Sequence, residues 1–326
     1  MIVRKLGAFK DWKALKAADL GELSRTAREL SWKNVGKELL TFIPGRMMHH
    51  KVSGKYPTIS ITGRACALNC DHCQRKILGY MVPAATPELL YKELMKAWNG
   101  GDLGALVSGG SRKDGTLPWD EFIPVIKRIK KETKLTISVH TGLIDKKTAM
   151  ALKDAGIDEF LIDVIGDDRT MRRVYHLDVG IKKMQDSVKA LAATGVPLIP
   201  HIVFGLNYGK VSGEFEALEM VARAKPYAVV IVVLIPIKGS PMDGLRPPDP
   251  KDVARFLANV RLRLPRTPVA LSCARPTGKY RETLDALAVE VGVNRIAMPA
   301  NSAIQMAKKY GLKVKQYRTC CSKSYW

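Results

Sequence analysis

The sequence contains little cysteine and no long apolar run. Cysteine accounts for only six of the 326 residues. A helix that crosses a bilayer needs ~18 or more apolar residues, and the longest apolar stretch, residues 228–237, predicts one buried strand instead. Charged residues interrupt the first positions, MIVRKLGAFKDWK, where a signal peptide has its apolar core. We therefore expect a cytoplasmic protein without membrane contact, whose reduced thiols bind metal in preference to forming disulfides.

Acidic residues are scarce relative to basic ones. Asp and Glu number 31 against 53 Lys and Arg, which gives a formal net charge of +22. Such a field attracts acidic proteins or nucleic acid, although a solvated lysine-rich surface has the same composition. The basic residues are spread along the chain, and aromatics are not interleaved with them as in proteins that stack bases. This distribution disfavours nucleic acid and leaves open an acidic protein partner or a solvated surface.

Short apolar, β-branched segments alternate with amphipathic ones along the chain. Amphipathic segments with helix-start signals lie between the strands, for example at residues 249–264, where Asp249 is placed to cap and Pro250 suits the first helical position. This alternation predicts an α/β fold, a (β/α)₈ TIM-type barrel. The eight predicted strands are residues 57–62, 105–110, 135–142, 159–166, 197–205, 228–237, 267–273 and 295–299.

Three domains follow from this pattern. Residues 1–52 are predicted to form an N-terminal helical extension, residues 53–311 the barrel, and residues 312–326 a C-terminal tail over the barrel mouth. In such barrels the chemistry lies on the loops after the C-terminal ends of the strands, so the polar segments that follow the predicted strands converge on one mouth.

Half of the cysteines lie in the loop after the first predicted strand. The segment CALNCDHC spaces Cys66, Cys70 and Cys73 as CxxxCxxC. Structural zinc sites want four ligands, and His72 would be a strained fourth inside so tight a loop. An iron-sulfur cluster on three thiolates keeps one iron open for a ligand. We therefore favour a cluster over zinc, with the missing fourth thiolate as the ligand position.

This loop resembles the signature of radical S-adenosylmethionine (SAM) enzymes, and the resemblance covers nearly the whole chain. It implies a [4Fe-4S] cluster on the three cysteines, with SAM on the open iron. The segment LVSGGS resembles the family's glycine-rich turn that receives the SAM amino group, through Ser108, Gly109 and Gly110. Read without the family, the same glycines are consistent with a plain tight turn.

Further SAM contacts are implied by position in the barrel. Asp163 in the fourth predicted strand matches a contact to the ribose hydroxyls, and Arg172 and Arg173 after that strand match a contact to the carboxylate. An exposed arginine pair is also common without any function. His140 ends the third predicted strand at the mouth and joins the candidate cofactor-binding residues.

The second half of the chain resembles the biotin synthase branch of the family. The segments VLIPIKGSPM and LSCARP carry this resemblance, and Arg275 matches the arginine that biotin synthase uses at its auxiliary cluster. Cys273 lies two residues earlier, on the same side of the strand. Biotin synthase carries further cluster cysteines in its barrel strands, whereas this chain has only His140 near one such place. Authentic biotin synthase is therefore disfavoured.

The remaining cysteines are Cys273, Cys320 and Cys321, the last two in the terminal segment YRTCCSKSYW. They are either incidental or ligands of a second cluster, because free thiols on a tail are otherwise a liability. The serine-containing tail resembles that of lipoyl synthase, and the whole pattern resembles one component of the two-component lipoyl synthases. This resemblance implies a second [4Fe-4S] cluster that is sacrificed for sulfur, with Ser322, Ser324 or an open position as its fourth ligand.

The implied activity is sulfur insertion into an octanoyl chain on a carrier protein, in lipoyl cofactor biosynthesis. The first cluster would cleave SAM to a 5′-deoxyadenosyl radical, which takes hydrogen from the octanoyl chain, and the second would supply sulfur. Expected partners are an octanoylated lipoyl carrier protein, a homologous second lipoyl synthase component and a low-potential electron donor. The alternatives are another biotin synthase-like radical SAM enzyme of cofactor biosynthesis, or a metal protein that binds nucleic acid through its basic surface.

Overall fold

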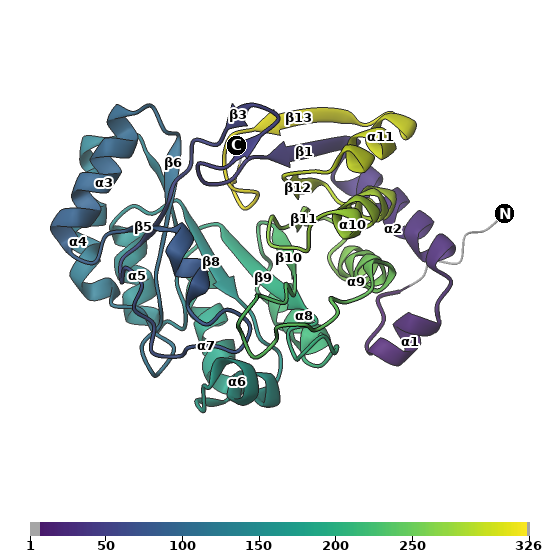
Figure 1. Ribbon diagram of the computed structural model, residues 1–326, viewed down its shortest axis with the longest axis horizontal. Coiled ribbons are helices and arrows are strands. Elements are labelled where there is room, and N and C mark those ends of the chain that lie inside the picture. Colours follow the sequence, from purple (N-terminus) through teal and green to yellow (C-terminus); the bar gives the residue numbers. More distant parts are fainter. Residues whose placement is uncertain (1–6, 325–326) are drawn as a thin grey trace.

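The protein is described by a computed structural model that covers residues 7–324. Its main feature is one curled sheet of eleven strands, all paired in parallel, in the order β13-β1-β12-β11-β10-β9-β8-β7-β6-β4-β5. Figure 1 shows this sheet as an open arc with the helices on its outer side. The predicted α/β barrel of TIM type is confirmed, in the form of a curled half-barrel.

The strands of the curled sheet are short. Their bounds are β1 Glu38–Phe42, β4 Thr58–Ser60, β5 Val82–Pro83, β6 Gly104–Ser108, β7 Thr136–His140, β8 Glu159–Asp163, β9 Leu198–Phe204, β10 Val229–Val233, β11 Val269–Leu271, β12 Arg295–Ala297 and β13 Lys313–Tyr317. A separate hairpin pairs β2 (Met48–His49) with β3 (Val52–Ser53).

Helices connect the strands and cover the convex face of the sheet. Their bounds are α1 Trp12–Ala17, α2 Leu20–Asn34, η1 Lys76–Tyr80, α3 Pro87–Asn99, α4 Trp119–Glu132, α5 Lys146–Asp154, α6 Asp168–Tyr175, α7 Gly180–Ala192, α8 Glu214–Arg223, α9 Pro250–Arg263, α10 Lys279–Glu290 and α11 Asn301–Lys309. As predicted, α9 begins with a capping Asp249, whose side chain accepts a hydrogen bond from the Lys251 amide.

Each of the eight predicted strands overlaps an observed one, and three further strands widen the sheet. One of them, β1, lies in the segment predicted to be a helical extension, and it pairs with β12 and β13. Residues 1–52 are therefore not purely helical, and β13 joins part of the predicted tail to the sheet. The local sequence pattern did not predict β1 or β13, because the pairing partners of β1 lie more than 250 positions away in the sequence.

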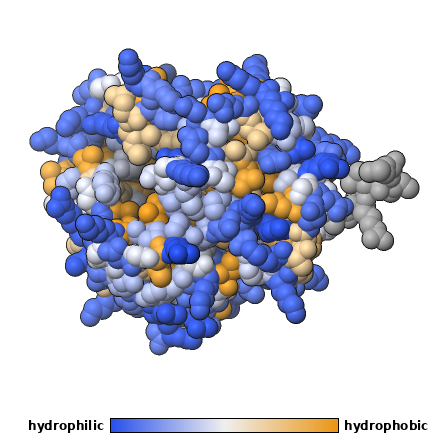
Figure 2. All heavy atoms as spheres, turned by 45° about the vertical axis from the view of Figure 1, so that its right-hand side comes forward, coloured by the Kyte–Doolittle hydropathy of each residue, from blue (hydrophilic) through white to orange (hydrophobic). Residues whose placement is uncertain are grey.

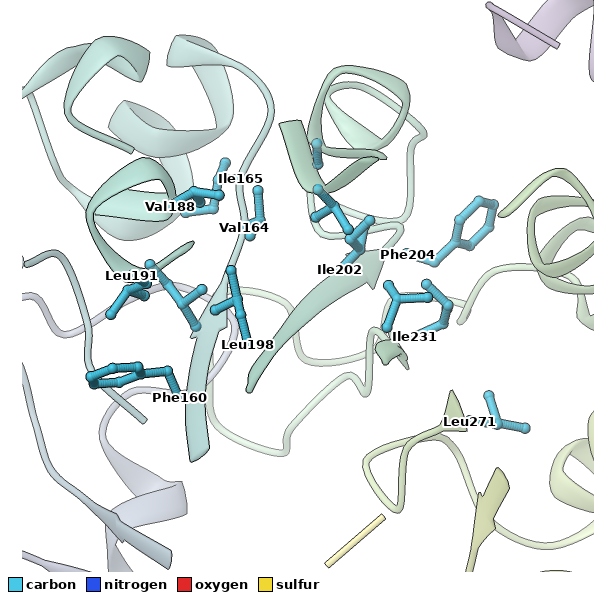
Figure 3. Packing of buried hydrophobic residues seen from close by; sticks show 14 of the residues in the cluster. Phe160, Val164, Ile165, Val188, Leu191, Leu198, Ile202, Phe204, Ile231 and Leu271 are labelled. Carbon is cyan, nitrogen blue, oxygen red and sulfur yellow. The ribbon is translucent and has the colours of Figure 1, made fainter. Parts of the chain in front are cut away.

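The main hydrophobic core lies between the sheet and its outer helices. Figure 3 shows Phe160 and Leu198 packed with Leu191 of α7, and Ile202 of β9 near Ile231 of β10. All five side chains are buried. Because successive residues of a strand face opposite sides, the intervening positions of these strands point into the barrel interior.

A second, smaller cluster fills the barrel interior. It contains Leu161, Ile199, Val230 and Ala270 from four neighbouring strands, together with Cys321 of the C-terminal tail. The tail therefore lies inside the half-barrel, packed on its inner wall. Figure 1 shows the end of the chain turning into the opening of the arc. The tail was predicted to lie over the barrel mouth. It instead extends into the interior, where Cys321 packs against apolar side chains of the inner wall.

The outer surface is mostly hydrophilic on the face drawn in Figure 2, with apolar side chains in small groups among the charged ones. Among residues 7–324, no helix combines the length and the apolar character needed to span a bilayer. The charged residues at positions 1–6, and Tyr325 of the SKSY segment, lie outside the described residues.

Candidate functional site

The cysteine loop follows β4 and closes on itself within a few residues. The amides of Cys73 and Gln74 both donate to the carbonyl of Cys70, at 3.1 and 2.9 Å. Asn69, Gln74 and Arg75 have positive φ angles of 48°, 48° and 62°, which lets the chain turn tightly here. Cys70 and Cys73 are buried as a result, and Cys66 is partly exposed.

Side chains from two other parts of the barrel hold this loop in place. Asp71 accepts hydrogen bonds from Tyr208, at 2.5 Å, and lies 3.0 Å from Nε2 of His176. The other ring nitrogen of His176 lies 2.9 Å from the carbonyl of Leu68. His176 caps the C-terminal end of α6, which precedes β9, and Tyr208 follows β9. The loop is therefore held by segments before and after this strand, and these contacts position its cysteines.

The thiols of this loop influence one another strongly. A hydrogen bond from the Cys70 thiol, together with His72, lowers the pKa of Cys73, and the same bond raises the pKa of Cys70. The ligand atoms of Cys70, His72 and Cys73 lie within 4.8 Å of one another, and Cys66 is not part of this tighter group. His72, which the sequence disfavoured as a ligand, therefore lies beside two of the thiols.

The glycine-rich turn after β6 packs directly against the cysteine loop. A methyl group at Gly110 would lie 2.0 Å from the carbonyl oxygen of Ala65 and 2.5 Å from Cβ of Cys66. The amide of Gly110 also donates to Oγ1 of Thr62 at 2.7 Å. Only glycine permits this approach, so the turn and the loop form one continuous wall. Ser108 and Gly109 line the same wall.

A cavity of about 460 Å³ lies against the cysteine loop and the glycine turn. Two buried polar atoms on residues that line it, Nδ1 of His72 and the hydroxyl of Tyr175, have no hydrogen-bond partner among the described residues. Such atoms favour a cavity that receives a polar ligand. Three soft thiol donors at its edge fit an iron-sulfur cluster.

Two of the predicted cofactor-binding residues line this cavity and contact each other. Nε2 of His140 lies 3.5 Å from Oδ1 of Asp163. His201 of β9 lies against both, with its ring centroid 5.4 Å from that of His140. His201 was not among the predicted site residues. The sequence signal that could have identified it is a histidine at an inward-facing position of an otherwise apolar strand.

The two predicted arginines do not line the cavity. Arg172 lies 3.9 Å from Asp178 on the surface, and Arg173 lies over the ring of Tyr208, 4.1 Å from its centroid. Both side chains point outward, because on α6 the buried positions are Thr170, Met171 and Val174. Arg172 and Arg173 therefore lie outside the residues that line the cavity, and their contact to a SAM carboxylate stays a prediction.

The three remaining cysteines approach one another inside the barrel. Cys320 and Cys321 share a hydrogen bond that lowers the pKa of Cys320 and raises that of Cys321. Burial, and then the neighbouring Cys320, raise the pKa of Cys273. Cys273 lines the same cavity as the cysteine loop. The three sulfur atoms do not form a group as tight as that of Cys70, His72 and Cys73.

Two buried ionic side chains hold the tail in this position. Oε1 of Glu159 accepts hydrogen bonds from the amide and hydroxyl of Ser324, and Lys323 lies 3.2 Å from the same oxygen. Arg295 donates to the carbonyls of Cys321 and Lys323 at 3.3 and 2.9 Å. Glu159 has no solvent exposure. The tail is therefore a fixed part of the interior.

Arg275 differs from the expectation that the biotin synthase resemblance raised. Its side chain is fully buried and binds the carboxylate of Asp285 through Nε and Nη2, both at 2.7 Å. The remaining donors bind backbone carbonyls of Ser272, Ala297 and Met298. All five N–H groups of the guanidinium are thus used inside the protein. The arginine has no donor to offer a cluster, and its role is structural.

Comparisons with known proteins agree with this geometry. Residues 60–214 match the Radical SAM superfamily. Biotin synthase of Hyphomonas neptunium is 27% identical over 256 residues, covering 74% of this chain and 76% of the relative. Biotin synthase of Ruthia magnifica subsp. Calyptogena magnifica is 27% identical over 180 residues, covering 54% of this chain and 52% of the relative. The chain thus spans only about half the length of some of the curated relatives that it matches.

Solved structures share the fold. Methylornithine synthase superposes with a TM-score of 0.66 at 15% identity, covering 96% of each chain. The FeFe-hydrogenase maturase HydG of Carboxydothermus hydrogenoformans superposes with a TM-score of 0.65 at 17% identity, covering 93% of this chain and 74% of that one. These solved structures show a shared fold, and the match to the Radical SAM superfamily covers residues 60–214, which contain the CxxxCxxC loop and the glycine turn.

Proposed function

We propose that this protein is a radical SAM enzyme that inserts sulfur into a protein-bound octanoyl chain, as one component of a two-component lipoyl synthase. The observation that carries the proposal is the meeting of Cys273 with Cys320 and Cys321 inside the barrel. Three further thiols at this place provide ligands for the second cluster that sulfur insertion requires. The similarity to biotin synthases supports the assignment to the biotin synthase-like branch on which this proposal rests.

The first cluster site consists of Cys66, Cys70 and Cys73. These three residues would hold a [4Fe-4S] cluster, which would supply the electron needed for cleavage of SAM. The chain's own contribution is to position the three thiols through Asp71 and its partners. Gly110 packs closely against Cys66, and both residues line the adjoining cavity.

The second cluster site consists of Cys273, Cys320 and Cys321. A cluster held there would supply the sulfur, and the buried tail would exclude water and stray hydrogen donors from the interior. Ser324 is occupied by Glu159, whereas Ser322 has no solvent exposure and lies next to Cys320. Of the two serines considered for the fourth ligand, Ser322 is the one we propose.

The partners follow from the same proposal. Lipoyl carrier domains are typically acidic, and the net charge of +22 suits such a partner. The reaction also requires a homologous second component for the other sulfur atom and a low-potential electron donor. The basic surface thereby acquires a role in recognition of the octanoylated carrier protein.

The decisive experiment is mass spectrometry of an octanoyl-lysine peptide incubated anaerobically with the reconstituted protein, reductant and SAM. A mass increase of one sulfur on the octanoyl chain, together with 5′-deoxyadenosine, supports the proposal. Formation of 5′-deoxyadenosine without a thiolated product, with or without a second cluster, would contradict it. That result would favour a radical enzyme of the same branch with a different substrate. Methylornithine synthase, which superposes over 96% of each chain, is a structural precedent for it.

A further inference from the structure

The second group of potential ligands lies in the barrel interior, apart from the cysteines. His140 and Asp163 are the last residues of β7 and β8, and His201 lies on the next strand, β9. Asp163 is directly paired with His201 in the register of the two strands. Three neighbouring strands therefore present their side chains to one point, and the rigid sheet fixes their spacing.

The distances between these side chains suit a shared metal ion. One ligand atom from each residue lies within 4.8 Å of the other two. The 3.5 Å between Nε2 of His140 and Oδ1 of Asp163 is longer than an ordinary hydrogen bond. Two ligands of a tetrahedral ion, each at about 2.1 Å, lie about 3.4 Å apart. The pair is thus spaced as two ligands of one ion would be.

A hydrogen bond selects the ring nitrogen that His201 can offer. Nδ1 of His201 lies 3.1 Å from the carbonyl oxygen of Ile199. A carbonyl only accepts hydrogen bonds, so Nδ1 carries the proton and Nε2 carries the lone pair. Metal-binding histidines are commonly oriented by such a bond from the second nitrogen. The arrangement leaves Nε2 of His201 ready to bind without a change of tautomer.

The donor groups also suit a cation. Asp163 supplies a carboxylate between two imidazoles, and its ligand atom lies within 4.8 Å of those of His140 and His201. A carboxylate with two imidazoles is a donor set that divalent ions accept.

We propose that His140, Asp163 and His201 bind one divalent first-row transition-metal ion. Two histidines and one carboxylate are a donor set that such ions accept, with coordination positions left for other ligands. His140 and Asp163 also line the cavity of the cysteine loop, so an open position is accessible to a carboxylate or carbonyl group of a molecule bound there. This inference does not depend on the sulfur-insertion proposal.

A competing explanation assigns the three side chains to the second cluster. Cys320 lies close enough to His140 to raise its pKa, so His140 could serve as a ligand beside the tail cysteines. The two explanations differ in what the cysteines contribute. A separate site retains its ion when Cys273, Cys320 and Cys321 are removed, whereas a cluster ligand does not.

The test measures zinc and iron in the same samples. The full chain, with its clusters reconstituted anaerobically, is equilibrated with Zn²⁺ at increasing concentration, freed of unbound metal and analysed by inductively coupled plasma mass spectrometry. We expect one tightly retained zinc per chain in addition to the iron. Asp163→Asn and His201→Gln should each weaken zinc binding at least tenfold, because each removes one of three ligands, while the iron content stays that of the wild type.

Two control variants make the outcome specific. The double variant His49→Gln/His50→Gln removes a pair of histidines outside the cavity, with ring centroids 4.2 Å apart, and should retain zinc. The variant that replaces Cys273, Cys320 and Cys321 with Ala should retain zinc and lose iron. Zinc that disappears with the three cysteines but persists in His201→Gln would overturn the proposal, as would the absence of stoichiometric zinc from the folded wild-type protein.

Discussion

Arg275 and Asp285 form a bidentate ion pair in which neither side chain is exposed to solvent. Arg275 follows β11 and Asp285 lies on α10, so the pair joins the sheet to the helix that packs outside it. Asp285 also accepts a hydrogen bond from the amide of Ala300, at 2.8 Å. One carboxylate thus anchors the strand ends of β11 and β12 at the barrel mouth.

Replacing Asp285 with Asn should destabilise the fold by about 3–5 kcal/mol, because it leaves the charge of Arg275 buried and unpaired. Chemical denaturation measures the change in the free energy of unfolding. Asp186→Asn is the matched control, since it breaks an exposed pair with Lys182 on α7 and should change the free energy of unfolding far less. A loss for Asp285→Asn as small as that of the control would show that the interior pair is dispensable.

Replacing Cys66, Cys70 and Cys73 with Ala should abolish formation of 5′-deoxyadenosine, because the electron that cleaves SAM would have no cluster to come from. Liquid chromatography of anaerobic reactions with reductant and SAM measures the product. Cys273→Ala is the control, because it lines the same cavity but belongs to the other set. Continued cleavage by the triple variant would refute the assignment of the loop.

Replacing Cys273, Cys320 and Cys321 with Ala should halve the iron content and end sulfur transfer, while cleavage of SAM continues. The expectation follows from the loss of one of two cubane clusters of about four irons each. Iron analysis and mass spectrometry of the octanoyl-lysine peptide provide the two measurements. A variant that keeps all of its iron would show that the tail cysteines do not bind a cluster.

Replacing Glu159 with Gln should release the tail from the barrel interior. The change removes the charge that Lys323 contacts and weakens the bonds from Ser324. Limited digestion with trypsin, followed by mass spectrometry, should then show faster cleavage after Arg318, whose Nε otherwise donates to the carbonyl of Ser53. Glu219→Gln, which breaks a surface pair with Arg263, should leave the cleavage rate unchanged. Equal rates in both variants would argue against Glu159 as the anchor.

Glu214 should make the stability of the protein depend on pH near neutrality. Burial raises its pKa from 4.5 to about 7, although two backbone amides donate to the carboxylate. A carboxyl group with a raised folded-state pKa contributes its stability below the unfolded-state value, and the contribution is lost as pH rises through the folded-state value. Between about pH 4.5 and 7 the loss amounts to about 3 kcal/mol.

Thermal unfolding midpoints across this pH window test the effect. The midpoint of the wild type should fall as pH rises, and Glu214→Gln should flatten that slope, because an amide does not titrate. The test compares slopes and not absolute stabilities, because the substitution also changes the hydrogen bonds. Glutamine has one acceptor oxygen for the amides of Gly205 and Ser212, whereas the carboxylate has two. An unchanged slope would mean that another group causes the pH dependence.

Features that depend on local pattern could be predicted from the amino-acid sequence. Alternation of short apolar segments with amphipathic ones predicted the eight central strands, because the period of burial is written into each segment. The spacing of Cys66, Cys70 and Cys73 predicted the first site, since all three lie within one loop. Gly109 and Gly110 were recognisable for the same reason.

Features that join distant parts of the chain became apparent only in three dimensions. The tertiary structure added β1 and β13 to the sheet, placed the tail inside the barrel and paired Arg275 with Asp285. It also brought His201 against His140 and Asp163. No local pattern encodes such neighbours, because side chains from separate strands meet only after the register and curvature of the whole sheet have been set.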